Sequence, residues 1–129
     1  MKVLVLSGNI FEEKEINNTL EDLQQIVGGY IEIPFLSPTF NDNKIDVIIN
    51  DEGKFIEGLE PEIAIVGKET NAILDIVYGN CIFASHTAEG DTIGLNDEQI
   101  NIVKEKLKSD IVLYDRKGDR HYLAKELFV

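Results

Sequence analysis

Few residues in this chain could perform nucleophilic or metal chemistry: one cysteine, Cys81, and two histidines, His86 and His121. A zinc site needs clustered His, Cys or carboxylate ligands, and neither histidine has a second ligand at helical or turn spacing. Cys81 and His86 could form a nucleophile–base pair, but five residues along a predicted strand place their side chains on opposite faces. We therefore predict no catalytic residue, no metal and no cofactor.

Two further patterns that could carry chemistry have ordinary structural explanations. Adjacent acidic pairs, such as Asp51–Glu52 and Asp97–Glu98, fall in predicted turns or at a helix start, where solvated carboxylates are common. Gly28–Gly29 ends a predicted helix and leads into a strand, whereas a phosphate-binding loop leads into a helix. An enzyme of an undescribed kind stays as an alternative, which a pocket joining His86 or His121 to a carboxylate would support.

A cluster of cations near the C-terminus is the candidate ligand-binding site: Arg116, Lys117 and Arg120. Anionic ligands are held by cations and unpaired amides, so a nucleotide-like molecule is the ligand class that these residues suit. Sequestration of such a small ligand is therefore one alternative function. Other cations that could contribute are Lys44, Lys54 and Lys68.

The net charge of −12 is distributed unevenly along the chain. Residues 1–109 carry 20 acidic and 8 basic side chains, whereas residues 110–129 carry four of each. Nucleic-acid binding depends on cations that displace counterions from phosphates, so direct binding to DNA or RNA is not expected. The charge favours a partner protein with a basic surface, and a DNA-mimicking inhibitor of a nucleic-acid-binding host protein is a second alternative.

Length and composition indicate a single domain over residues 1–129, because 129 residues of which 43% are hydrophobic can bury one core. No apolar run approaches the roughly 20 residues that span a bilayer. The opening segment, residues 1–6, lacks the cleavage pattern of a secretory signal. Together with the lone cysteine, which fits a reducing compartment, these features predict a cytoplasmic protein without membrane contact.

The first half of the chain predicts short alternating elements. An apolar stripe at Ile16, Leu20, Leu23 and Val27 predicts a helix, which Asn18 can cap and which Gly28–Gly29 ends. The other predicted elements are a strand over 2–7, a strand over 30–33, a polar loop over 37–44, and a hairpin whose strands 46–50 and 54–56 flank a turn.

The second half predicts more strands and a second helix. Periodicity cannot decide whether residues 62–66 form a helix or a strand. Two apolar runs, 73–78 and 80–84, are typical of core strands that a bulge interrupts at Gly79. Asn96 and Gln99 have capping-box spacing at the start of a helix over 97–108, and residues 111–114 and 121–124 predict a second hairpin.

These elements predict an α+β fold: an antiparallel or mixed β-sheet of about five to seven strands with two α-helices packed on one face. The pattern does not specify the strand order. Strand edges at the C-terminal hairpin would be exposed, so a homodimer formed by sheet extension is compatible with the sequence.

Three stretches together resemble the family called domain of unknown function 3846: TLEDLQQIVGGYIE at 19–32, NDEGK at 50–54 and GDTIGLNDEQI at 90–100. The resemblance covers residues 1–108 as an α+β core and leaves residues 109–129 as a C-terminal β-hairpin extension. It implies a small accessory protein of phages, plasmids or integrative elements with no established activity. We accordingly expect a non-enzymatic binding module that acts on a host or mobile-element protein.

Overall fold

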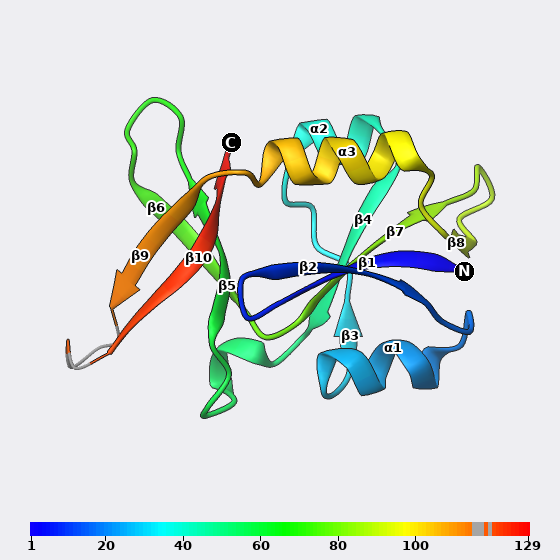
Figure 1. The fold of residues 1–129 in the computed structure, drawn as a ribbon, viewed down its shortest axis with the longest axis horizontal. Coiled ribbons are helices and arrows are strands. Elements are labelled where there is room, and N and C mark those ends of the chain that lie inside the picture. Colours follow the sequence, from blue (N-terminus) through cyan, green and yellow to red (C-terminus); the bar gives the residue numbers. More distant parts are fainter. Residues whose placement is uncertain (115–117, 119) are drawn as a thin grey trace.

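The computed structural model describes residues 1–114, 118 and 120–129, and it has the predicted α+β class (Figure 1). Its strands form two sheets, one of six strands and one of four. The helices are α1 Leu20–Val27, α2 Pro38–Asp42 and α3 Asp97–Lys106, with a 3₁₀ turn, η1, at Gly53–Phe55. The strands are β1 Lys2–Ser7, β2 Ile10–Glu15, β3 Ile31–Glu32, β4 Ile45–Asn50, β5 Pro61–Val66, β6 Ile73–Tyr78, β7 Cys81–His86, β8 Thr92–Ile93, β9 Asp110–Tyr114 and β10 His121–Phe128.

The six-stranded sheet has the order β2-β1-β7-β4-β3, with β8 paired to the end of β7. The β1–β2 hairpin turns through Gly8 and Asn9, whose φ angles of 57° and 64° suit a type I′ turn. Strand β2 was not predicted, because apolar and polar residues do not alternate regularly in its sequence, IFEEKE. It forms because an edge strand needs a partner on one side only, and its charges face solvent.

The helices cover both faces of this sheet, so the prediction of two helices on one face was wrong (Figure 1). Leu4 and Leu6 of β1 pack in the cluster that contains α3 residues, whereas Val3 and Val5 pack in the cluster that contains α1 residues. The physical reason is the continuous apolar sequence of the inner strands. A strand without a polar face must be buried on both sides.

Local capping signals correctly predicted the start of α3 and the end of α1. The capping box between Asn96 and Gln99 is present at the start of α3, and Gly28, at φ 83°, ends α1. The cap of α1 is Thr19 rather than Asn18, whose amide instead donates to the Thr92 carbonyl. No helix in the described part of the chain is long and apolar enough to cross a membrane.

The four-stranded sheet has the order β6-β5-β10-β9 and is mixed, because β5 and β10 run parallel. Residues 62–66, for which the sequence did not decide between helix and strand, form a strand. The two apolar runs on either side of Gly79 lie in different sheets, so Gly79, at φ 85°, turns the chain between sheets and is not a bulge. Strand β6 is an edge, with Leu74 61% exposed.

The hairpin predicted around residues 50–53 does not exist. After β4 the chain enters η1, and β4 pairs with β3 and β7 instead. Tertiary contacts explain the difference. The Asn50 side chain donates to the Val27 carbonyl, and a Cβ on Gly53 would lie 2.7 Å from the Tyr78 carbonyl oxygen. Residues 38–42, predicted as loop, form α2, which begins with Ser37 as its cap and a proline in its first turn.

The C-terminal hairpin is confirmed, with β9 and β10 paired antiparallel. Strand β10 lies inside the second sheet, between β5 and β9, and fully buried Leu127 joins the same core cluster as Ile63 and Leu6. This hairpin is therefore packed into the core that holds the two sheets together.

Candidate functional site

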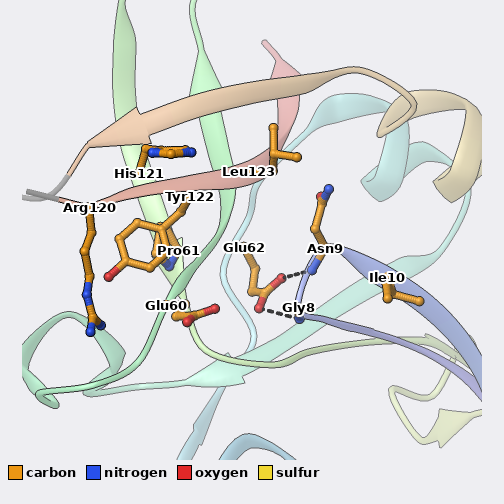
Figure 2. A pocket seen from close by; sticks show the side chains of 10 residues that line it. All are labelled: Gly8, Asn9, Ile10, Glu60, Pro61, Glu62, Arg120, His121, Tyr122 and Leu123. Carbon is orange, nitrogen blue, oxygen red and sulfur yellow. Dashed lines mark hydrogen bonds between the residues drawn. The ribbon is translucent and has the colours of Figure 1, made fainter.

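A cleft of about 710 Å³ opens where the two sheets diverge (Figure 2). Three segments form it: the β1–β2 turn, the start of β5 and the start of β10. Its lining residues are Gly8, Asn9, Ile10, Glu60, Pro61, Glu62, Arg120, His121, Tyr122 and Leu123.

Glu62 is a buried carboxylate in this lining, with only 3% of its surface exposed. Its two oxygens accept hydrogen bonds from the backbone N–H groups of Gly8, at 2.9 Å, and Asn9, at 3.0 Å. These bonds, drawn in Figure 2, fasten the β1–β2 turn to the second sheet. Burial raises the pKa of Glu62, the two backbone bonds oppose that rise, and the nearby charge of Glu60 adds to it.

Replacing Glu62 by alanine is expected to lower the free energy of unfolding by about 1–3 kcal/mol, because two backbone N–H groups lose their acceptor. Since the folded pKa lies above the ordinary 4.5, the folded state binds the proton more tightly. The contribution of Glu62 is therefore largest below pH 4.5 and falls as pH rises through the folded pKa. Urea unfolding of the wild type and of Glu62→Ala, from below pH 4.5 to neutral pH, measures this difference in the free energy of unfolding.

The exposed neighbour Glu60 provides the control for this experiment. Glu60→Ala should change the free energy of unfolding by no more than about 0.5 kcal/mol. Equal losses in the two variants, or a difference between wild type and Glu62→Ala that does not vary with pH, would contradict the role given to Glu62.

An exposed apolar strip begins in the cleft beside these carboxylates and continues outside it onto β9. Ile10, on the β1–β2 hairpin, is 70% exposed, and Leu123, on β10, is 52% exposed. Opposite Leu123 on β9 is Val112, and opposite His121 is Tyr114, which is 70% exposed. By strand alternation Leu123 shares a face with core residue Leu127, so the strip is the uncovered continuation of the core face of the second sheet.

Of the predicted cation cluster, Arg120 lines the cleft; it is exposed and lies immediately before β10. Figure 2 shows its side chain near those of Tyr122 and Glu60. Arg116 and Lys117 lie outside the described residues. Lys44, Lys54 and Lys68 do not line the cleft, and Lys54 forms an ion pair with Asp75 on β6.

The structure pairs His86 with a carboxylate that the sequence could not indicate. His86 Nδ1 lies 3.0 Å from Oδ2 of Asp46, 40 residues away, because β4 and β7 are neighbours. Neither residue lines the cleft. Cys81 is fully buried, and desolvation strongly raises the pKa of its thiol, which disfavours the nucleophilic thiolate. Among the described residues, no three His, Cys, Asp or Glu side chains are grouped to hold a metal ion.

In a comparison with known proteins, residues 1–108 match the family model described as domain of unknown function (DUF3846). No curated protein and no solved structure matches the chain. The matched region supplies the cleft residues from the β1–β2 turn and β5, whereas Arg120, His121, Tyr122 and Leu123 lie beyond it. The cleft thus combines the shared domain with the hairpin that follows it.

Proposed function

This chain belongs to the DUF3846 family, and on that premise we propose that it is a non-enzymatic binding module whose cleft receives a segment of a partner protein. The family resemblance further suggests an accessory role in a mobile genetic element. The observation that carries the proposal is the cleft itself, in which large apolar side chains from separate strands stand exposed. Such exposed apolar groups in a concave site are typical of interaction surfaces.

The cleft chemistry favours a partner segment that is apolar and basic. Ile10 and Leu123 offer contacts to an apolar side chain, while exposed Glu60 can pair with a lysine or arginine beside it. Arg120 supplies donors for backbone carbonyls of the same segment. The net charge of −12 would also speed the approach of a basic surface.

The alternatives receive less support from the geometry. The carboxylates of Glu60 and Glu62 disfavour a nucleotide-like anion in the cleft. Exposed carboxylates occur on both α1 and α3, which lie on opposite faces of the six-stranded sheet, whereas a DNA mimic needs one continuous acidic face. An enzyme could draw on His121 beside these carboxylates, but both oxygens of Glu62 already accept backbone N–H groups.

Leu123→Asp is expected to abolish partner retention, because it places a charge in the apolar strip of the cleft. The control is Leu20→Asp, which changes the charge equally at a leucine that is 57% exposed on α1, outside the cleft. Affinity purification of the full chain and both variants from a host lysate, followed by mass spectrometry, measures which proteins are retained. We expect the wild type and Leu20→Asp to share a set of basic proteins that Leu123→Asp loses.

Two results would overturn the proposed function. One is that the wild type retains no specific protein at low and at moderate salt. The other is that Leu123→Asp retains the same proteins as Leu20→Asp. Thermal unfolding of both variants shows whether each is folded.

A further inference from the structure

The long edge strands of the two sheets differ in how well they resist pairing with another strand. Exposed sheet edges associate unless charge, brevity or side-chain cover blocks them. Strand β2 carries Glu12, Glu13 and Glu15, and β3 and β8 are two residues each. On β6, Asp75 accepts a hydrogen bond from the N–H of Ile76 at 2.8 Å and also binds Lys54, so its carboxylate covers that edge.

Strand β9 is less protected: among the described residues its one charge is Asp110 at its start, which is ion-paired with Lys125 on the neighbouring strand β10. Its last four residues, 111–114, are Ile-Val-Leu-Tyr without a charge, and Ile111, Val112 and Tyr114 are of types that favour β-structure. Val112 is 45% and Tyr114 70% exposed, so apolar surface accompanies the edge. The N–H of Glu126 donates to the carbonyl of Ser109, and by antiparallel alternation the backbone groups of Val112 and Tyr114 point away from β10.

The charge distribution indicates which kind of partner can pair with the β9 edge. Two copies of a chain that carries −12 repel one another over most of their surface. The segment 110–129, which forms β9 and β10, has four acidic and four basic residues and is neutral. Copies can therefore approach at β9 with the least repulsion, whereas a basic partner would gain nothing from this edge.

We propose that two copies of this chain dimerise by antiparallel pairing of their β9 strands, which joins the two four-stranded sheets into one of eight strands. A two-fold axis at Val112 makes the contact self-complementary and places the two Val112 Cα atoms about 5.5 Å apart. The two Val112 side chains then lie opposite each other, and Tyr114 of each copy lies opposite Asp110 of the other. This dimer does not depend on what the cleft binds.

The test is the mass of the full chain in solution, measured by light scattering after size exclusion. We expect twice the 14.5 kDa chain mass for the wild type and the monomer mass for Val112→Lys, whose charge blocks the edge. Leu20→Lys carries the same added charge on α1 and should remain dimeric. Thermal unfolding of both variants shows whether each is folded.

A cross-link gives an independent measurement. In Val112→Cys the introduced thiol is exposed, whereas the native Cys81 is fully buried. Mild oxidation should yield a covalent dimer of Val112→Cys, because the separation at the two-fold axis suits a disulfide, and should leave Leu20→Cys monomeric on a denaturing gel. A wild type with the monomer mass at every concentration, a dimeric Val112→Lys, or equal cross-linking of the two cysteine variants would overturn the proposal.

Discussion

Removal of residues 109–129 is expected to abolish cooperative folding of the remaining chain. Strand β10 pairs with β5 over four residues, and Val129 extends that pairing by donating its N–H to the Val66 carbonyl. Truncation also removes Leu127, Leu113 and Ala124 from the core. Loss of one buried leucine side chain costs about 2–5 kcal/mol, against roughly 5–15 kcal/mol for the stability of a whole domain.

Circular dichroism during heating of residues 1–108 measures this effect. A cooperative transition of the fragment near the wild-type Tm would show that the hairpin is dispensable. A matched pair of point variants tests the same packing in the full chain. Leu127→Ala should lose about 2–5 kcal/mol, whereas Leu123→Ala, on the same strand but 52% exposed, should lose far less.

Phe83→Ala is expected to be the most damaging single substitution, with a loss of about 3–5 kcal/mol in the free energy of unfolding. Phe83 is fully buried on β7, the central strand of the six-stranded sheet. Its ring lies 6.0 Å from that of Phe40 on α2 and 6.1 Å from that of Phe11 on β2. Its removal would leave a cavity where three elements meet.

Phe55→Ala is the control, because Phe55 is 88% exposed. We expect a change within about 0.5 kcal/mol for this variant. Urea unfolding of both variants at neutral pH gives the comparison. Similar losses at the two positions would mean that Phe83 does not have the core role that the structure assigns to it.

The two proposals share a structural origin in the C-terminal hairpin. Its strand β10 supplies one wall of the cleft, and its strand β9 supplies the unprotected sheet edge. Both lie beyond the part of the chain that matches the family. The hairpin is therefore where this protein would acquire a partner or a symmetry that the matched region alone does not specify.

Sequence alone determined the features that depend on neighbouring residues. The capping box of Asn96 and Gln99, the left-handed stop at Gly28 and the C-terminal hairpin were all predicted and are present. Each rests on hydrogen bonds or backbone angles within a few residues, so the residue types themselves carry the information. The α+β class and the family resemblance were confirmed for related reasons: both rest on the types and order of residues along the chain.

Only the tertiary structure decided which distant segments meet. The turn after Asn50 looked like a hairpin, but Asn50 bonds to Val27 and Gly53 packs against Tyr78, and these contacts direct the chain elsewhere. The same holds for the pairing of His86 with Asp46 and for Glu62, whose carboxylate meets a turn more than 50 residues away. Such contacts depend on how the sheets and helices bury their apolar faces together, and local sequence patterns do not encode that arrangement.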